Sequence, residues 1–259
     1  MGVINATDDS FYAGSRVSSA ASAAEKAVKM TEEGADIIDL GAYSTRPGGG
    51  VISPEEERKA LVEAVKAVRS ALPETIISAD TFRAGVAEAA VNAGADMVND
   101  VGGGSFDPRM TETVAACRVP YVLMHNRGTP TTMHKNPAYG DVVNEVVREL
   151  SVKLDALYAA GAADVIVDPG FGFAKSAAHN FELLMRLEEL SILDAPVLAG
   201  LSRKSMIWRT LGITAADALN GTTALNMLAL ERGAQILRVH DVRPAAEAVA
   251  LWERCRRFA

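Results

Sequence analysis

The 259-residue sequence predicts an α/β protein, a (β/α)₈ TIM barrel in which residues 1–259 form a single domain. Short apolar, β-branched runs alternate with longer stretches rich in Ala, Glu and Lys, which is typical of strand and helix units around a parallel sheet. Eight such pairs occur, so each has about 32 residues, in keeping with barrels of about 250 residues. A doubly wound open sheet is the structural alternative, but its usual glycine fingerprint is missing.

The expected strands are short runs dominated by Ile, Val, Leu and Ala. They lie at residues 2–6, 36–40, 75–80, 96–99, 120–125, 164–168, 196–199 and 235–240. The expected helices are the amphipathic stretches between them. They lie at residues 18–33, 53–71, 83–93, 107–117, 139–160, 177–189, 203–232 with a break near Gly212, and 243–257.

A Gly-Ala dipeptide recurs shortly before four of the expected strands, at Gly34, Gly94, Gly161 and Gly233. A glycine in such a place ends a helix in the left-handed conformation and lets the chain turn. The repeat therefore marks where one helix ends and the next strand begins.

Composition and charge exclude several classes of protein. The net charge of -7 offers no basic face for nucleic acid. No apolar run approaches the roughly 18 to 20 residues of a membrane helix, so we expect no membrane partner. Asn5, Asp8 and Asp9 stand where the apolar segment of a signal peptide would be. Two cysteines cannot build a disulfide framework, so a cytoplasmic location is expected.

Side chains that carry chemistry follow the expected strands at their carboxyl ends, where the active sites of such barrels lie. In chain order they are Asn5, Ser44, Thr45, Arg46, Asp80, Asn99, Met124, His125, Asp168, Ser202, Arg203, Lys204, Arg238 and His240. In the last strand, Arg238 and His240 alternate with apolar residues, so both point into the barrel mouth if the apolar pair faces the helices. Capping of the next helix is the alternative for Asp80 with Thr81 and for Ser202.

These residue types suit an anionic, nitrogen-rich small molecule. A carboxylate such as Asp168 accepts from guanidine-like N–H groups, and Lys204 donates to a neighbouring carbonyl. Arg238, His240 and a metal ion suit a phosphate group. Asp39 either braces the loop after its strand or pairs within the barrel, and His125 contributes at most to a pocket wall.

Eight segments of the chain resemble the dihydropteroate synthases, the folate-pathway enzymes that sulfonamides target. They are GVINATDDSF from Gly2, DIIDLGAYSTRPGG from Asp36, ISADT from Ile77, ADMVNDVGG from Ala95, LMHNRGTP from Leu123, IVDPGFGFAKSAAHN from Ile166, GLSRKS from Gly200 and ILRVHDVR from Ile236. One such motif alone is a weak signal, but eight in family order cover essentially the whole chain.

The resemblance implies an enzyme that joins 6-hydroxymethyl-7,8-dihydropterin pyrophosphate to p-aminobenzoate, giving 7,8-dihydropteroate and pyrophosphate. It places the pterin on Asp80, Asn99, Met124, Asp168, Gly200 and Lys204. It places pyrophosphate on Asn5, Arg46, Arg238 and His240, and p-aminobenzoate on Thr45, Arg46, Pro47, Phe173, Lys204 and Ser205. It further implies that Asp80, Lys204, Arg238 and Asn5 are catalytic, that Asn5 is a ligand of Mg²⁺, and that the protein is a homodimer.

The residue types are consistent with that chemistry. An arylamine is neutral near pH 7, so no strong general base is required, and stabilisation of the leaving group carries the reaction. As the C–O bond breaks, Asp80 favours the cationic methylene while Arg238 and His240 favour the anionic pyrophosphate. Mg²⁺ prefers oxygen ligands and keeps waters, so Asn5 and pyrophosphate oxygens suffice without a carboxylate cage.

The sequence departs from the family pattern in three places. Asp8 stands where the family usually has proline, which removes a fixed φ. Tyr43 occupies a position often held by glutamate. The segment that usually precedes the first strand is absent, which we expect to affect stability more than the site. Glycines 102–104 predict a βα turn rather than a phosphate cradle, because no Lys-Ser/Thr pair follows them.

Two other functions remain as alternatives. One is a methyltetrahydrofolate-binding methyltransferase domain, which has a related barrel and would need a cobalamin partner. The other is a non-catalytic pterin-binding or scaffolding paralogue. The loop with the sequence STRPG at residues 44–48 and the pair Arg238 and His240 favour a substrate that carries pyrophosphate.

Overall fold

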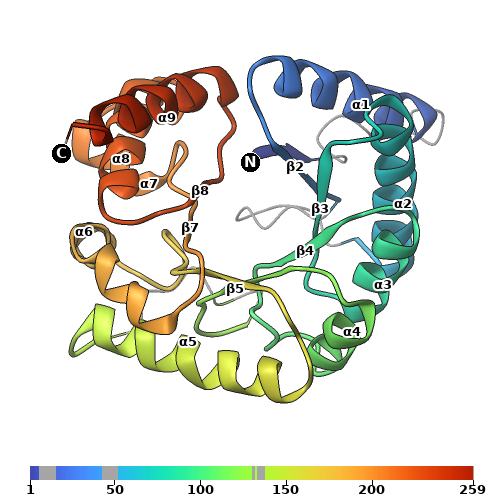
Figure 1. Cartoon of the computed structure of the whole chain (residues 1–259), viewed down its shortest axis with the longest axis horizontal. Coiled ribbons are helices and arrows are strands. Elements are labelled where there is room, and N and C mark those ends of the chain that lie inside the picture. The colour runs from blue at the N-terminus through green and yellow to red at the C-terminus, as the bar shows by residue number, and fades with distance from the viewer. Residues whose placement is uncertain (6–15, 43–51, 130–131, 133–137, 259) are drawn as a thin grey trace.

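In the described part of the chain, eight parallel strands form the inner wall, and helices surround them in an outer ring (Figure 1). The structure is a computed structural model, and it describes residues 1–5, 16–42, 52–129, 132 and 138–258. The strands are β1 (Gly2–Asn5), β2 (Ile37–Gly41), β3 (Ile76–Asp80), β4 (Met97–Asp100), β5 (Tyr121–Met124), β6 (Val165–Asp168), β7 (Leu198–Ala199) and β8 (Ile236–Leu237). All eight expected strands are confirmed.

The helices follow the strands in the expected alternation. They are α1 (Arg16–Glu32), α2 (Pro54–Ala71), α3 (Ala84–Asn92), α4 (Met110–Cys117), α5 (Val142–Ala159), α6 (Ala177–Met185), a 3₁₀ helix η1 (Leu187–Leu193), α7 (Ser205–Leu211), α8 (Leu219–Glu231) and α9 (Val242–Arg256). The break near Gly212 is confirmed, because this residue ends α7 with φ of 66°. The expected helix over 177–189 instead divides into α6 and η1.

Hydrogen bonds between neighbouring strands close the sheet into a barrel. Strands β1 to β6 form one parallel sheet, and β7 pairs with β8. Parallel bridges join Gly2 to Val239 and Val167 to Val197, which connects the two sheets at both edges. The prediction of a (β/α)₈ barrel is therefore confirmed, and the open-sheet alternative is wrong.

Local sequence explains how several helices begin and end. Ser53 caps α2 in a capping box with Glu56, and Pro54 occupies the first turn, where its missing N–H costs nothing. All four glycines of the Gly-Ala repeat have φ between 96° and 112°. These are backbone angles that glycine adopts without strain, so the predicted helix ends are confirmed.

Side chains along each strand alternate between two apolar environments. One face packs against the helices, where Tyr121, Leu123 and many small residues are fully buried. The other face points into the barrel, where a smaller cluster fills the lower interior with Met97, Val122, Leu198, Ile37, Ile166 and Ile236. This layer closes the barrel beneath its carboxyl end.

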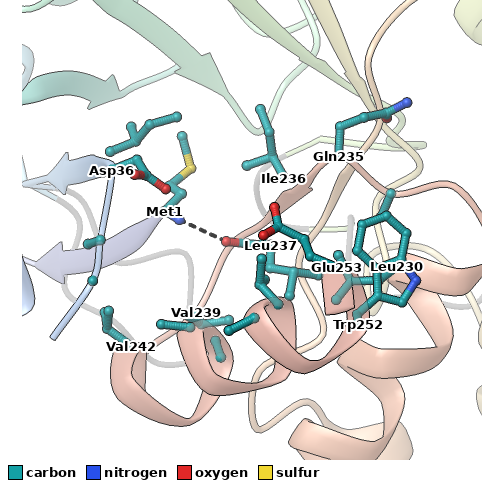
Figure 2. A pocket seen from close by; sticks show the side chains of 18 of the residues that line it. Met1, Asp36, Leu230, Gln235, Ile236, Leu237, Val239, Val242, Trp252 and Glu253 are labelled. Carbon is teal, nitrogen blue, oxygen red and sulfur yellow. Dashed lines mark hydrogen bonds between the residues drawn. The ribbon is translucent and has the colours of Figure 1, made fainter. Parts of the chain in front are cut away.

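A pocket of about 550 Å³ lies toward the opposite end, between the first residues of β2 and β8 and the inner face of α9 (Figure 2). The amino group of Met1 donates to Leu237 O at 3.0 Å beside it. The side chains that line it are mostly apolar, and the polar residues expected to bind substrate are not among them. In the part of the chain that the structure describes, every helix is too short or too polar to span a bilayer.

Candidate active site

Several residues expected to bind the pterin or pyrophosphate lie two positions beyond the interior apolar layer, toward the carboxyl end of the barrel. Because side chains alternate along a strand, a residue two positions on points into the barrel as well. Met97, Val122, Ile166, Leu198 and Ile236 of the layer are followed in this way by Asn99, Met124, Asp168, Gly200 and Arg238. Asp39 follows Ile37 by the same rule. The barrel thus brings these six residues to one mouth.

Arg238 is held between two carboxylates from other strands. Its Nε donates to Asp39 Oδ2 at 2.7 Å, and its Nη2 donates to Asp80 Oδ2 at 2.6 Å. Asn99 Nδ2 donates to the same Asp39 oxygen at 3.1 Å. Asp39 is fully buried, so it pairs within the barrel, which decides between its two expected roles. The predicted inward direction of Arg238 is confirmed.

The pKa values of Asp80 and Arg238 depend on two opposing effects, burial and the charge of the ion-pair partner. Burial raises the pKa of Asp80 to about 7, with Arg238 opposing the shift and Asp39 adding to it. Burial lowers the pKa of Arg238, but the two carboxylates outweigh it, so that pKa lies above its ordinary value. The guanidinium is therefore charged at every physiological pH.

Asp168 and Lys204 flank the segment of residues 169–176 that follows β6. Asp168 is 7% exposed, and its Oδ1 accepts from Gly170 N at 2.7 Å. Lys204 Nζ donates to Phe171 O and lies 4.8 Å from the centre of the Phe173 ring. Burial raises the pKa of Asp168 and lowers that of Lys204 to about 8, and each charge opposes the shift of the other.

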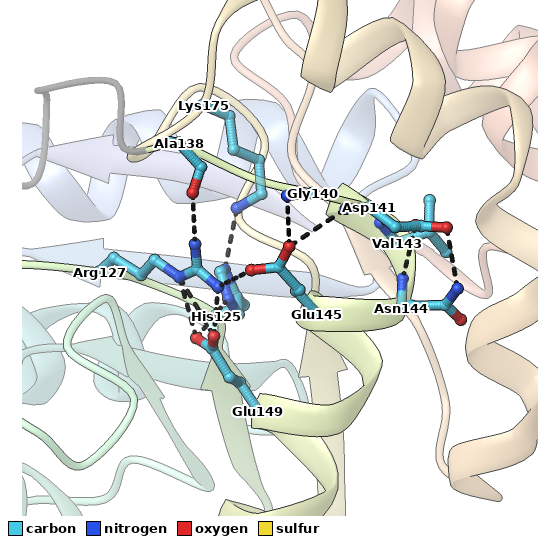
Figure 3. Close-up of polar contacts among 10 residues, drawn as sticks. All are labelled: His125, Arg127, Ala138, Gly140, Asp141, Val143, Asn144, Glu145, Glu149 and Lys175. Carbon is cyan, nitrogen blue, oxygen red and sulfur yellow. Dashed lines mark hydrogen bonds and ion pairs between the residues drawn. The ribbon is translucent and has the colours of Figure 1, made fainter.

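A second polar cluster lies beside this segment and was missed by the sequence analysis (Figure 3). Lys175 Nζ lies 2.9 Å from His125 Nδ1, and His125 Nε2 lies 3.0 Å from Glu149 Oε2. Burial lowers the pKa of Lys175 to about 7 and that of His125 to about 4. The only signal in the sequence was a lysine in the glycine-rich segment after β6.

The other expected site residues lie around the same mouth where the structure describes them. Asn5 ends β1, and Ser205 begins α7 and is exposed. His240 Nδ1 lies 3.0 Å from Ser202 Oγ, so Ser202 contacts a neighbouring loop rather than capping α7. Thr45, Arg46 and Pro47 lie outside the described residues, as do Asp8 and Tyr43.

Hydrogen bonds decide two further expectations from the sequence, the turn at glycines 102–104 and the role of Thr81 before α3. Asp100 accepts from Gly102 N at 2.7 Å and from Gly104 N at 2.8 Å, so these N–H groups are engaged within the protein. The prediction of a βα turn is confirmed. Thr81 Oγ1 accepts from Arg83 N at 3.2 Å and donates to buried Glu57 at 2.6 Å, so it links α2 to the start of α3.

Comparison with known proteins places the chain in a family. The model of the pterin-binding enzymes matches residues 1–240. The chain belongs to the pterin-binding enzyme family. Within it, the dihydropteroate synthase of Synechocystis is 42% identical over an alignment of 259 positions, which covers 97% of this chain and 89% of the relative.

Solved structures of pterin-binding enzymes have the same fold. Dihydropteroate synthase of Xanthomonas albilineans with 4-aminobenzoic acid is 40% identical, with a TM-score of 0.90 over 99% of this chain and 92% of that one. The enzyme of Yersinia pestis in a sulfonamide drug complex is 37% identical, with a TM-score of 0.92 over 99% and 94%. The resemblance drawn from the eight segments is confirmed.

Proposed function

We propose that this protein joins 6-hydroxymethyl-7,8-dihydropterin pyrophosphate to p-aminobenzoate, forming 7,8-dihydropteroate and releasing pyrophosphate. The observation that carries the proposal is the ring of polar side chains at the barrel mouth, in which Asp39, Asn99, Asp168 and Arg238 each lie two residues beyond the apolar layer. This ring offers acceptors, amides and cations in one place. Related enzymes with the same fold bind 4-aminobenzoic acid.

The pterin ring would lie on the carboxylate and amide side of the mouth. Asp168 would accept from the N–H groups on the edge of the pterin, and Lys204 would donate to the carbonyl beside them. Asn99 and Asp80 would bind the remaining polar atoms, with Met124 and Gly200 as walls. Asp168 is buried and has lost most of its hydrating water, so hydrogen bonds from the pterin N–H groups would stabilise its carboxylate strongly.

Departure of pyrophosphate would be assisted by the cations. As the C–O bond lengthens, negative charge grows on the leaving oxygen beside Arg238 and His240. Positive charge grows on the methylene, where the Asp80 carboxylate stabilises it. The arylamine nitrogen attacks with its own lone pair, forming the C–N bond as the C–O bond breaks, and the acidic arylammonium then gives its proton to water or to the released pyrophosphate. The residues therefore need to orient the amine rather than deprotonate it beforehand.

Mg²⁺ fits this mouth as an ion bound chiefly through substrate oxygens. Among the described residues, no three His, Cys, Asp or Glu side chains are arranged to hold a metal. An amide such as Asn5 supplies one oxygen ligand, and Mg²⁺ keeps several waters and binds readily to phosphate groups. Bound there, the ion would neutralise charge on the leaving pyrophosphate. We propose Asn5 as its protein ligand.

The p-aminobenzoate pocket would adjoin Lys204. Phe173 offers an aromatic face 4.8 Å from Nζ, and Ser205 follows on α7. We propose that Thr45, Arg46 and Pro47 complete the pocket and that Arg46 also binds pyrophosphate. Sulfonamides would compete for this pocket, as the drug complex of a relative supports.

We also propose a single domain over residues 1–259, because one buried core runs through α1 to α9. The resemblance supports a homodimer, which sedimentation would show as twice the chain mass of 27.3 kDa. A cytoplasmic location is supported by Cys117 and Cys255, both of which are free thiols. Small-molecule substrates are the only partners that the proposed reaction requires.

Release of pyrophosphate tests the proposed function directly. Purified protein with Mg²⁺ and the pterin pyrophosphate should release pyrophosphate at a rate that depends on p-aminobenzoate, with dihydropteroate as the second product. A methyltransferase domain would bind a folate without this turnover. A scaffolding paralogue would bind the pterin and release nothing, and either result would overturn the proposal.

A further inference from the structure

The buried side chain of Lys175 holds the 169–176 segment. Its Nζ lies 2.9 Å from His125 Nδ1, 3.2 Å from Gly170 O and 3.3 Å from Phe173 O. The residue is 5% exposed. An ammonium group has three N–H bonds, and three acceptors surround it here. Two of them are carbonyl groups of the segment itself, so this side chain joins both ends of the turn.

The contact with Glu149 fixes the hydrogen of His125. An ionised carboxylate only accepts, so Nε2 of the neutral ring carries the hydrogen and Nδ1 accepts from Lys175. Nε2 then donates to Glu149 Oε2 at 3.0 Å, and Arg127 Nε donates to Glu149 Oε1 at 3.1 Å. Lys175 is thereby connected to His125, which directly follows β5, and through it to Glu149 of α5 (Figure 3).

The opposite side of the segment touches Lys204. Phe171 O accepts from Lys204 Nζ, and the Phe173 ring lies beside the same group. Gly172 also passes close by, since a Cβ built there would lie 3.1 Å from Lys204 Cδ. The position of the segment therefore sets where both the amino group and the aromatic ring lie.

We propose that Lys175 is a positioning residue for the arylamine side of the site. Its amino group holds the segment so that the Phe171 carbonyl and the Phe173 ring stay against Lys204. The inference rests on the proposed function, which assigns Phe173 and Lys204 to p-aminobenzoate. The pterin side shares Lys204 and contacts the segment through Asp168, but Asp80 and Asn99 lie on other strands, so we expect it to depend on Lys175 less than the arylamine side does.

Steady-state kinetics of Lys175→Met test this proposal. The variant keeps the apolar stem and loses the donors. We expect KM for p-aminobenzoate to rise at least about tenfold while KM for the pterin pyrophosphate changes less than about threefold. Lys153→Met is the matched control, because Lys153 contacts Ser105 Oγ at 2.9 Å, outside the segment. Both of its KM values should match those of the wild type.

Asn180→Ala tests the same segment without disturbing the buried amino group. Asn180 Oδ1 accepts from Gly172 N at 2.7 Å, and its Nδ2 donates to Ser176 O at 2.7 Å. The same split between the two KM values is expected, whether or not Lys175→Met folds. Unchanged KM values in folded variants, or two KM values that rise together, would overturn the inference. Wild-type protein that makes no dihydropteroate would overturn the proposed function instead.

Discussion

The guanidinium of Arg238 lies 2.6 Å from the carboxylate of Asp80, although 158 positions separate the two residues. Asp39 completes the arrangement at 2.7 Å from Nε. A cation bound by two carboxylates is partly neutralised before any substrate arrives. Incoming pyrophosphate therefore has to share Arg238 with them, and the local field at the mouth depends on both aspartates.

Asp39→Ala should destabilise the protein, because it leaves part of the Arg238 charge unpaired within the barrel. Removing one partner of a buried ion pair costs about 3–5 kcal/mol. Urea denaturation measures the free energy of unfolding. Asp36→Ala is the control, since Asp36 is exposed three residues earlier, and its effect should stay within about 0.5 kcal/mol. Equal losses in the two variants would contradict the role given to Asp39.

Local features of the fold were predictable from the sequence. The spacing of apolar residues predicted where the strands lie, and the Gly-Ala repeat predicted where four helices end. Both features are determined by residues within a few positions along the chain. The alternation of side chains also predicted that Arg238 points inward. No contact far along the chain was needed for these predictions.

The pairing of the polar residues was not predictable in the same way. His125 was expected only to line a wall, yet it connects Lys175 to Glu149. Asp39 had two open roles until its contact with Arg238, 199 positions away, decided between them. Such partners meet only when the barrel closes, and a single sequence does not show which of several inward-facing charges become neighbours.

Asp168→Asn should weaken pterin binding while the fold is kept. The asparagine side-chain carbonyl can still accept from Gly170 N, which Asp168 Oδ1 does at 2.7 Å. The other position becomes an amide donor, which would face the N–H groups of the pterin. Loss of a charged hydrogen bond and the new mismatch cost roughly 1.5–3 kcal/mol, or about 10- to 150-fold in Kd.

Calorimetry with pterin-6-carboxylate would show this loss. Thermal unfolding of the same variant is the control, and it should stay close to that of the wild type. Unchanged affinity for the pterin would mean that the ring lies elsewhere in the mouth.

Lys204→Ala should abolish most of the synthesis and leave the fold intact. Lys204 contacts the Phe171 carbonyl and the Phe173 ring and lies between the two proposed substrate pockets. Loss of one charged hydrogen bond in the transition state lowers kcat/KM roughly 10- to 150-fold, and loss of contacts to both substrates lowers it further. Lys59→Ala removes a lysine from the exposed pair with Glu63 and should leave turnover unchanged. Wild-type turnover in Lys204→Ala would contradict the assignment.

Acid should destabilise the protein through His125 in a defined pH range. Burial lowers its pKa from 6.5 to about 4, and the positive charge of Lys175 adds to the shift, while the hydrogen bond to Glu149 opposes it. Between these two pH values the unfolded chain binds more protons than the folded chain, so stability falls as the pH falls. The full loss is about 3 kcal/mol, from 1.36 kcal/mol for each pKa unit.

The pH window of His125 also contains the titration of Asp80, whose pKa is raised from 3.8 to about 7 and whose contribution to stability grows as the pH falls, so a variant is needed to separate the two groups. The pKa of Glu149 is lowered from 4.5 to about 2, chiefly by its hydrogen bond to His125, so its contribution is lost only below pH 4.5. The pKa of Lys175 is about 7 in the folded protein, so this group changes its proton binding mainly above pH 7. Denaturation of His125→Asn and wild-type protein between pH 4.5 and 6.5 isolates the imidazole. The variant should be less stable at pH 7 because it loses the contacts to Lys175 and Glu149, yet its stability should vary less across this window. An equal slope in both proteins would mean that folding does not lower the pKa of His125, so that the ring takes up its second proton within this window and its Nδ1 then cannot accept from Lys175.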